Sequence, residues 1–516
     1  MRTVSIEEWK QTIPEFVEKT EEFYRGELAK PAYKSFSGYY GSYAQRSGQE
    51  SMLRLRMTAG RVDRGKLKFI ADTIRENKIR KLHFTTCQTI QLHDLTCDQV
   101  CSLMPEVLEH GIIPMGGGGD YPRNVMCSPL SGVEKGEYFD VQPWAAAAAQ
   151  SLMTLVTAEK MPRKLKVGFS NSPLNATHAT YRDLGFVARP DGTFDVYSAG
   201  GLGNNPKMGV RVAEQVAPDQ ILYYIKAMWL TFRTYGDYKN RGRARTRYLQ
   251  EILGGAENYA QAYQEKLAEV RTEGEDLTIR LTPQEQEAKQ GDGSEAPEDF
   301  RVIAQKQEGL YAVCWHPVGG TPTPEEFCRV ADWILATEGA QLRLGPDETA
   351  YVVNLTGREV AELLKLIPDS ASSAFEASVA CIGASVCQVG IRDSQALLKR
   401  CVEAVREAKL PADALPQIHI SGCPSSCGTH QTAAIGFRGA ARMVDKKPQP
   451  AFLLVAGGVS EQGEETMGEE IGTLLEEEIP AFLVRLGSAA AQSGMSYEEW
   501  LRENPNGLRE IAAEYL

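Results

Sequence analysis

The sequence of 516 residues lacks any apolar run long enough to cross a membrane. Its most apolar stretch, 144–156, is alanine-rich and too short, so we expect it to form a packed helix. The first residues, MRTVSIEEWKQTIPEF, lack the basic start and apolar run of a secretion signal. These absences predict a cytoplasmic protein that has no membrane partner.

An excess of positive charge is also missing. Lysine and arginine together number 56, against 68 aspartates and glutamates, which gives a net charge of −12. Non-specific binding to nucleic acid or to an anionic membrane requires a cationic surface, so we expect neither. The 42% hydrophobic and 24% charged content is typical of a globular protein, and the length predicts two to four domains.

The chain matches itself at a constant offset, from GRVDRGKLKFIADTI (60–74) to GTPTPEEFCRVADWI (320–334). Each copy predicts an apolar strand, a glycine turn, a helix, a second strand and another helix. We therefore expect one α+β half-domain to be used twice, paired about a pseudo-two-fold axis.

The polar residues are not duplicated. At the same offset, Arg54 aligns with Cys314, Gln91 aligns with Tyr351 and His93 aligns with Val353. The sequence therefore predicts one cationic, hydrogen-bonding site, on the first copy, with the second copy as scaffold.

Eleven cysteines in a cytoplasmic protein are not expected to form disulfides. Two close pairs stand out, in CIGASVC (381–387) and CPSSC (423–427), and together they can supply the four sulfur ligands of a [4Fe–4S] cluster. Zinc fits less well, because five residues between ligands is long for a zinc knuckle. Burial as small apolar residues would also account for them. A third pair, Cys97 and Cys101, has helical spacing, and we expect it on an apolar helix face.

Basic residues gather in three segments. Arg123 follows a glycine run, Arg163, Lys164 and Lys166 lie in MPRKLKV, and YKNRGRARTRY contains Arg241, Arg243, Arg245 and Arg247. Strand-like alternation places Lys164 and Lys166 on the same side, where two like charges favour an anion. A solvated surface would account for any single basic residue, and a nucleic-acid patch for the arginine run, although the acidic net charge weakens the latter.

Most of the chain resembles the sulfite and nitrite reductases that carry sirohaem and a [4Fe–4S] cluster. The segments that carry this resemblance, in family order, are MLRLRMTAG, TTCQTIQLH, YPRNVMC, MPRKLKV, AGGLG, NRGRARTRY, CIGASVC and ISGCPSSCG. The cysteine pairs with their flanks are the most specific of these segments. The glycine runs are not specific.

The resemblance implies roles for individual residues. The cluster ligands would be Cys381, Cys387, Cys423 and Cys427, and Cys427 would also bridge to the sirohaem iron. The residues around the open face of the iron, where the family binds its substrate anion, would be Arg54, Arg123, Lys164 and Lys166. The sirohaem environment would include Gln91, His93, Arg163, Arg241 and Arg243. Sirohaem bears eight carboxylates, which explains why an acidic protein concentrates arginine in a few segments.

The activity implied is the six-electron reduction of sulfite to sulfide, with nitrite reduction to ammonia as the alternative. Nitrite enzymes of the family tend to carry Asn at the position of Lys166, so MPRKLKV favours sulfite. Two further classes of protein would share part of the pattern, a non-catalytic iron–sulfur electron carrier and a tetrapyrrole-pathway relative. Because the sequence contains no recognisable flavin or nicotinamide module, we expect electrons from ferredoxin or from a separate reductase subunit.

One residue departs from the family pattern. Where the family usually has arginine, this chain has Cys87, in TTCQTIQLH. A cation near sirohaem is lost there, and a neutral replacement is favoured over thiol chemistry.

The fold class expected is α+β, with duplicated ferredoxin-like half-domains about a pseudo-two-fold axis and with sirohaem- and cluster-binding α/β domains. The predicted segments are an N-terminal extension (1–36), a first half-domain (37–113), a sirohaem-binding domain (114–281), a polar linker (282–302), a second half-domain (303–369) and a cluster domain (370–516).

Overall fold

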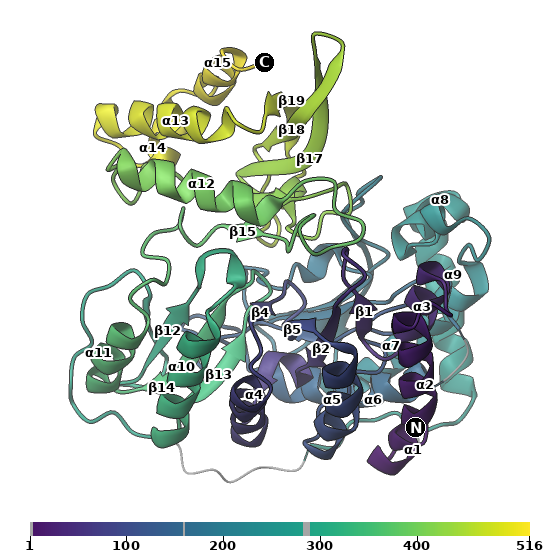
Figure 1. Ribbon diagram of the computed structural model, residues 1–516. Coiled ribbons are helices and arrows are strands. Elements are labelled where there is room, and N and C mark those ends of the chain that lie inside the picture. Colours follow the sequence, from purple (N-terminus) through teal and green to yellow (C-terminus); the bar gives the residue numbers. More distant parts are fainter. Residues whose placement is uncertain (1–3, 158–159, 282–288) are drawn as a thin grey trace.

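The computed structural model describes residues 4–157, 160–281 and 289–516. The first part of the predicted linker, 282–288, lies outside these ranges. The described chain forms four β-sheets with helices packed against them (Figure 1). Within it, no helix is both long enough and apolar enough to span a membrane.

The N-terminal helices belong to the core of the half-domains. They are α1 (Ile6–Lys10), α2 (Ile13–Tyr24) and α3 (Lys30–Ser37). Trp9, Ile13 and Phe16 are buried in the same hydrophobic core as both half-domains. The predicted extension therefore stabilises the half-domains by burying apolar surface.

The two half-domains are antiparallel sheets, each covered by two helices. The first has the order β1-β2-β5-β4, with β1 (Ser42–Ala44), β2 (Ser51–Arg56), β4 (Lys81–Phe84), β5 (Thr89–Leu95), α4 (Arg64–Glu76) and α5 (Cys97–Glu109). The second has the order β11-β12-β14-β13-β3, with β11 (Val302–Ala304), β12 (Tyr311–Trp315), β13 (Gln341–Leu344), β14 (Ala350–Leu355), α10 (Pro324–Ala336) and α11 (Gly357–Leu366). Strand β3 (Arg61–Val62) leaves the first copy and pairs with β13 of the second.

The structure confirms the duplicated α+β fold. The side chains of Thr96 and Thr356 both form capping boxes, at the starts of α5 and α11. A Cβ at Gly60 would lie 2.9 Å from the carbonyl oxygen of Leu344, and a Cβ at Gly320 would lie 3.1 Å from that of Phe84. Since Phe84 and Leu344 are equivalent, each copy contacts the other in the same way, as a pseudo-two-fold axis requires. Helices α4 and α10 pack together across it (Figure 1).

The two sheets differ on the face turned away from their helices. In β2, Leu53 and Leu55 are buried in the core, while Arg54 alternates to the other face. In the second copy, the equivalent face packs Ala312 and Val353 against Val133. The second copy is therefore filled by apolar contacts where the first carries polar residues.

The remaining two sheets have the same topology as each other. In each, the first three strands are parallel and the last two are antiparallel. One contains β6 (Met126–Cys127), β7 (Val167–Ser170), β8 (Leu184–Ala188), β9 (Phe194–Ser198) and β10 (Val210–Val216), with α6 (Gln142–Val156), α7 (Ile221–Tyr235), α8 (Leu249–Ile252) and α9 (Ala256–Thr272). The other contains β15 (Val379–Ala380), β16 (Ile418–Ser421), β17 (Ile435–Val444), β18 (Lys447–Ala456) and β19 (Glu469–Leu475), with α12 (Ser394–Glu407), α13 (Ile479–Ser493), α14 (Tyr497–Glu503) and α15 (Gly507–Ala513).

This second likeness extends to backbone detail. His178 and Thr429 both adopt left-handed φ values of 56° before equivalent 3₁₀ turns. A Cβ at Gly185 would lie 1.8 Å from the carbonyl oxygen of Ala179, and one at Gly436 would lie 1.9 Å from that of His430. The duplication therefore covers these sheets too, although the self-match of the sequence does not extend to them.

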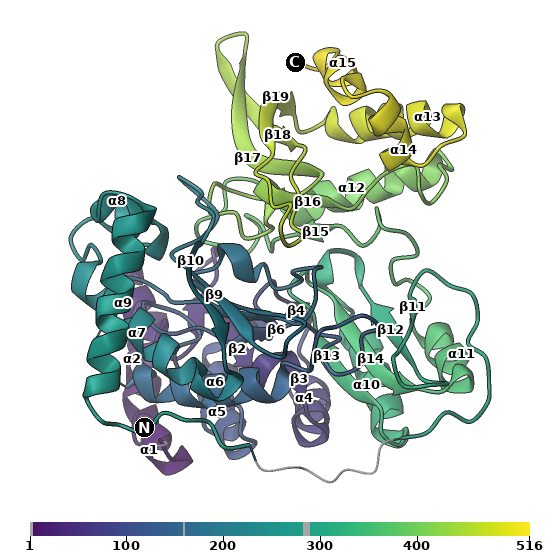
Figure 2. The same ribbon diagram turned by 180° about the vertical axis from the view of Figure 1, so that it is seen from behind.

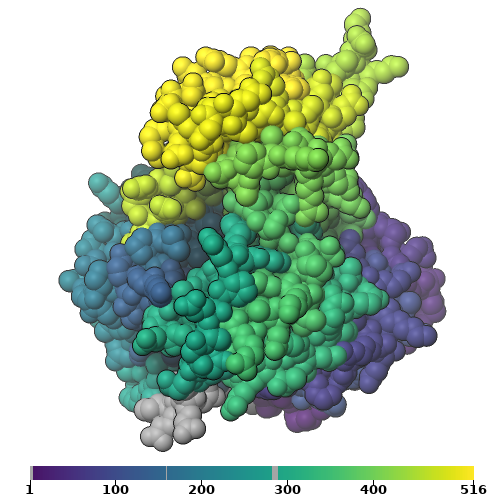
Figure 3. All heavy atoms as spheres, turned by 90° about the vertical axis from the view of Figure 1, so that its left-hand side faces the viewer, coloured from purple at the N-terminus to yellow at the C-terminus, as the bar shows by residue number. Residues whose placement is uncertain are grey.

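The C-terminal sheet and its helices lie on the side of the half-domain sheets opposite α4 and α10 (Figures 1 and 2). The space-filling view shows this segment seated on the rest of the molecule (Figure 3). Two hydrogen bonds from Arg46 fix it there, from the backbone N–H to the carbonyl of Val386 (3.1 Å) and from Nη1 to that of Ala384 (2.8 Å). The predicted apolar helix is α6, which buries Ala145, Ala148 and Leu152. The residue boundaries of the domains stay predictions.

Candidate active site

The polar face of the first half-domain places Arg54, Gln91 and His93 in one hydrogen-bonded row. Arg54 and Gln91 are cross-strand partners on β2 and β5. With its amide oxygen toward Arg54, Gln91 accepts a hydrogen bond from Arg54 Nη2 (2.6 Å), and its amide nitrogen donates to His93 Nε2 (3.3 Å). His93 Nδ1 lies 3.0 Å from the side-chain oxygen of Gln45. Burial, with His83, Lys81 and Arg54 nearby, lowers the pKa of His93 well below its usual range, so the neutral ring orients Gln91 and, through it, Arg54.

A second arginine meets Arg54 at the glycine run. Arg54 and Arg123 both donate to the carbonyl oxygen of Gly117, and Arg123 Nη2 also donates to that of Gly119 (2.9 Å). Burial is the main cause that lowers the pKa of Arg123 to about 10, and Arg54 adds to it. Two cations are therefore held side by side, both by backbone carbonyls and Arg54 also by the side-chain amide of Gln91.

Lys164 and Lys166 lie on the segment that runs beside Arg123. The backbone N–H of Arg123 donates to the carbonyl of Leu165 (2.8 Å), and the backbone N–H of Lys166 donates to Asp183 Oδ2 (2.8 Å). Leu165 is fully buried, so the lysines on either side of it point the other way. Burial lowers the pKa of Lys164 well below its usual range, and Arg245, Lys166 and Arg123 lower it further.

Cys87 lies among these cations, in the turn between β4 and β5. Asn124 Nδ2 donates to the carbonyl of Cys87 (3.0 Å) and ties this turn to the segment that carries Arg123. Burial raises the pKa of the Cys87 thiol, but four nearby cations outweigh burial and lower that pKa to about 6. These cations are Lys166, Arg182, Arg54 and Lys164. Cys87 is therefore mainly a thiolate at neutral pH.

The other predicted basic residues have carboxylate partners. Arg163 and Arg241 both bind Asp120, at 2.8 Å and 2.7 Å, and Arg245 binds Asp183 at 3.0 Å. Arg243 is half exposed and pairs with Glu251 (3.1 Å), so the structure does not bring it to the cations around Cys87.

Five cations around Cys87 have no such partner. Among the described residues, no carboxylate forms an ion pair with Arg54, Arg123, Lys164, Lys166 or Arg182, a set that we call the cation cluster. Buried nitrogens without a hydrogen-bond partner include Arg123 Nε and Arg182 Nη2, as well as Arg245 Nε and Arg247 Nη1 close by. Because buried unpaired charge is costly, these donors indicate anionic ligands that carry several negative charges. A tetrapyrrole with many carboxylates fits this donor set.

The four predicted cluster cysteines lie on two loops at the ends of β15 and β16. The backbone N–H of Gly422 donates to Cys381 Sγ (3.2 Å), which joins the two loops, and that of Val389 contacts Cys387 Sγ (3.5 Å). N–H donors to sulfur of this kind tune iron–sulfur clusters. Burial and, next in size, the neighbouring Cys427 raise the pKa of Cys381 to about 12, so a positive ligand would favour thiolates there.

All eleven cysteines carry free thiols. Across residues 4–157, 160–281 and 289–516, no three Cys, His, Asp or Glu side chains converge as ligands of a single metal ion do. A four-iron cluster is larger than one ion, and its ligands surround a volume, so a wider arrangement fits it. Cys423 is buried and Cys427 is exposed. The charge of Cys427 acts on the pKa of Lys164, which places the cluster loops next to the cation cluster.

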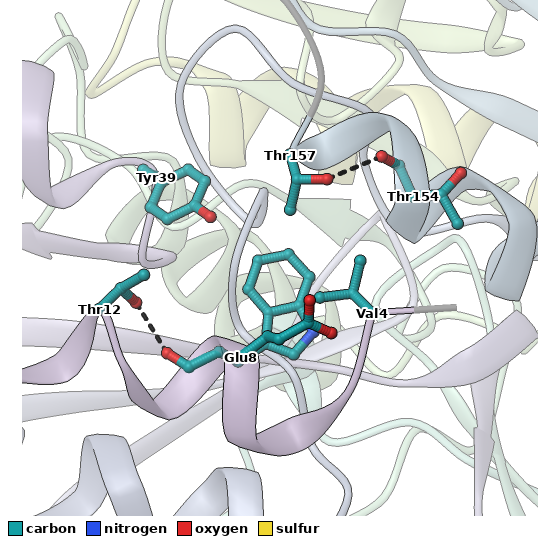
Figure 4. Close-up of a pocket in the computed structure, with 7 residues that line it drawn as sticks. Val4, Glu8, Thr12, Tyr39, Thr154 and Thr157 are labelled. Carbon is teal, nitrogen blue, oxygen red and sulfur yellow. Dashed lines mark hydrogen bonds between the residues drawn. The ribbon is translucent and has the colours of Figure 1, made fainter. Parts of the chain in front are cut away.

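Two cavities lie apart from this site. One, of about 350 Å³, is lined by α1, Tyr39 and the end of α6, and its lining residues include no basic side chain (Figure 4). The other, of about 770 Å³, lies against the alanine-rich face of α6, with Arg56 and Asn124 at its wall. Arg56 donates to the carbonyl of Met115 (2.6 Å). Neither cavity contains a member of the cation cluster.

Comparison with known proteins gives two family models and several relatives. Residues 118–270 match the nitrite and sulphite reductase 4Fe-4S domain, and residues 43–110 match the nitrite/sulfite reductase ferredoxin-like half domain. The chain is 24% identical to the assimilatory ferredoxin-dependent nitrite reductase of Haloferax mediterranei, covering 92% of this chain and 86% of that protein. It is 26% identical to sulfite reductase [ferredoxin] 1 of Mycolicibacterium paratuberculosis, covering 68% and 63%. The ferredoxin–nitrite reductase of Synechococcus elongatus is also 26% identical, over 79% and 80%.

The solved structure of the Mycobacterium tuberculosis NirA protein shares the fold. It superposes with a TM-score of 0.76 at 20% sequence identity, over 95% of this chain and 94% of that one. The chain belongs to the sulfite and nitrite reductase family.

The family's 4Fe-4S domain model matches 118–270, a segment whose only cysteine is the buried Cys127. In this family member, Ser172 and Ala176 occupy the positions equivalent to Cys423 and Cys427. The matched segment is therefore the copy of the domain without thiols at these two positions.

Sequence reasoning missed two residues of the site. Arg182 and Asp183 stand between strand-forming residues in TYRDLGF, with no motif around them. Only the folded chain brings them to Lys166 and Cys87.

Proposed function

We propose that this family member reduces sulfite to sulfide with six electrons, at a sirohaem coupled to a [4Fe–4S] cluster. The observation that carries the proposal is the cation cluster, which has no carboxylate partners among the described residues and lies beside Cys427. An anionic substrate and an anionic cofactor both match that charge.

Different segments of the chain hold the two cofactors. Cys381, Cys387, Cys423 and Cys427 hold the cluster within 370–516. The segment 114–281 holds sirohaem, with Arg163 and Arg241 in its surroundings. When bound, the sirohaem and the cluster supply the iron and the electron path for the reduction.

The residues of the chain bind the anion and supply protons. Arg54, oriented by Gln91 and His93, and Arg123 present fixed guanidinium groups to the anion and stabilise the charge as its bonds to oxygen break. Lys164 releases a proton more readily than an ordinary lysine, because burial and neighbouring cations lower its pKa. Lys164 therefore both attracts the anion and supplies protons for the oxygen that leaves as water.

Nitrite is the second candidate substrate. The names of the Haloferax and Synechococcus relatives specify nitrite, whereas that of the Mycolicibacterium relative specifies sulfite. Lys166, where nitrite enzymes of the family tend to carry Asn, is the observation that favours sulfite. The same names support ferredoxin as the electron donor, with a separate reductase subunit as the second candidate. Free thiols throughout suit a cytoplasmic location.

Two non-reductase functions fit less well. An iron–sulfur electron carrier would use the cysteines but has no need of partly buried cations without carboxylate partners among the described residues. A tetrapyrrole-pathway relative would need cations for carboxylates but not the pair of lysines beside Arg54 and Arg123.

The test is an anaerobic assay of the sirohaem-loaded protein with reduced methyl viologen and either sulfite or nitrite. We expect both anions to be reduced, sulfite with the higher kcat/KM. Reduction of neither anion would refute the proposal. Cys427→Ser should change the visible spectrum of the loaded protein, whereas Cys97→Ser, on α5 away from the site, should not. A Cys427→Ser spectrum identical to the parent would contradict the bridging role.

A further inference from the structure

Arg182 is a partly buried cation whose guanidinium has a protein partner on one side. It follows the 3₁₀ turn Ala179–Tyr181, and its Nε donates to the carbonyl of Thr177 (2.7 Å). Its Nη2 is buried and has no hydrogen-bond partner among the described residues. The guanidinium is therefore held in place by Nε while Nη2 remains available to a ligand.

Within the part of the chain that the structure describes, Arg182 has no carboxylate of its own. Burial lowers its pKa, while Cys87, Tyr181 and Asp183 act in the opposite direction. Asp183 is already bound by Arg245 (3.0 Å) and by the N–H of Lys166 (2.8 Å). Of these three groups, the thiolate of Cys87 is thus the anion that is not bound to another residue.

The fold itself does not require an arginine at this place. The equivalent position in the C-terminal copy is Ala433, which precedes β17, the equivalent of β8. The carbonyl of Ala433 accepts from the N–H of Gly458 (3.0 Å), as that of Arg182 accepts from the N–H of Gly200 (2.9 Å). Alanine makes the same turn, so the guanidinium serves something other than folding.

Cys87 and Arg182 are neighbours from different sheets. Cys87 stands where the family usually has an arginine near sirohaem, so this chain lacks one cation on the β4–β5 turn. Arg182 brings a cation to the same place from the segment just before β8.

We propose that Arg182 binds a carboxylate of the tetrapyrrole, in place of the family arginine that Cys87 replaces. This inference rests on the proposed function, since it requires a tetrapyrrole at the site. The guanidinium and the carboxylate form a charge-assisted hydrogen bond through the free Nη2.

The experiment measures cofactor retention and anion affinity separately. The parent, Arg182→Ala, Arg182→Lys, Cys87→Arg and the double variant C87R/R182A are produced with sirohaem. The tetrapyrrole per chain is measured by extraction, and its loss is followed during dilution. The affinity for sulfite is taken from titration of the visible spectrum. Arg358→Ala, on the exposed start of α11, is the matched control.

We expect Arg182→Ala to lose tetrapyrrole about tenfold faster than the parent. A change of this size corresponds to the loss of one hydrogen bond to a charged group. Arg182→Lys should be intermediate, C87R/R182A should return toward the parent, and R358A should match the parent. Circular dichroism checks that R182A folds. We expect it to fold, because Ala433 occupies the equivalent turn of the C-terminal copy. The rescue by C87R is the decisive result, because a merely structural arginine could not be replaced from another sheet.

Equal retention in R182A and the parent would overturn the proposal. Equal retention with weaker sulfite binding would also overturn it, and would assign Arg182 to the substrate oxyanion instead. A parent that binds no tetrapyrrole would refute the proposed function and this inference with it. A parent that binds tetrapyrrole but reduces neither anion would refute the activity alone, and the retention series would still decide the role of Arg182.

Discussion

Asp183 joins three parts of the site, and its replacement by asparagine tests how they are held. Its carboxylate binds Arg245 Nη2 (3.0 Å and 3.1 Å), the backbone N–H of Lys166 (2.8 Å) and the hydroxyl of Thr246. In Asp183→Asn the new NH₂ group cannot accept from any of these donors. Arg245 is then left buried beside Lys164 without a counter-charge.

The magnitude follows from burial. Asp183 is 1% exposed, and the side chain of Arg245 is 19% exposed. Removal of one partner of a buried ion pair costs about 3–5 kcal/mol of unfolding free energy. Asp276→Asn is the control, because the side chains of Asp276 and its partner Arg280 are 54% and 74% exposed and solvent screens the pair. We expect a much smaller cost for that variant, because solvent-exposed ion pairs contribute little to stability.

Urea unfolding of the cofactor-free proteins, followed by circular dichroism, measures the difference. Burial raises the pKa of Asp183, but Arg245 and the hydrogen bonds outweigh it and lower that pKa below the usual aspartate value. The stabilisation is therefore present above the unfolded pKa of about 4 and is lost as the pH falls through the lower folded value. The difference in unfolding free energy between the parent and Asp183→Asn should become smaller in acid. An Asp183→Asn cost no larger than that of Asp276→Asn at pH 7 would refute the reasoning.

Three further predictions concern substrate choice, thiol chemistry and the cluster loops. Lys166→Asn should lower the ratio of sulfite to nitrite kcat/KM in the viologen assay, and an unchanged ratio would remove the basis for preferring sulfite. In cofactor-free protein, alkylation of Cys87 by iodoacetamide should rise with a midpoint near pH 6, measured by mass spectrometry, and a midpoint near 9 would contradict the effect of the surrounding cations. Gly436→Ala would place a Cβ 1.9 Å from a backbone carbonyl oxygen, so it should cost about 1–3 kcal/mol or more and reduce cluster content. Gly65→Ala, whose Cβ meets its nearest atom at 3.4 Å, is the control, and equal cluster content in the two would contradict this packing argument.

The half-domain repeat could be predicted because it depends on residues that have local structural roles. Gly60 and Gly320 adopt positive φ in equivalent turns, and Thr96 and Thr356 cap equivalent helices. Such positions tolerate few residue types, so the two copies keep them and the self-match survives. The cations on the first copy could be predicted in the same way, as charged residues within otherwise apolar strands.

The second repeat and the contacts of the site could not be predicted in this way. In the second pair of sheets the likeness lies in backbone conformation, such as the left-handed φ of His178 and Thr429, which different side chains adopt. Arg163 and Arg241 both pair with Asp120, which lies more than forty residues before either of them in the sequence. Long-range pairing of this kind is decided by tertiary structure, so no local pattern reveals which arginines remain unpaired.

The duplication accounts for the single site in a molecule with two equivalent halves. The first copy keeps cations on its sheet but has Ser172 and Ala176 where thiols would be. The second copy keeps the thiols, and its sheet face is closed by Val353 packed against Val133. Neither copy could supply both groups, and the pseudo-two-fold axis places Cys427 of one beside Lys164 of the other. Each half therefore bears only part of the predicted chemistry, and the two parts meet where one half packs on the other.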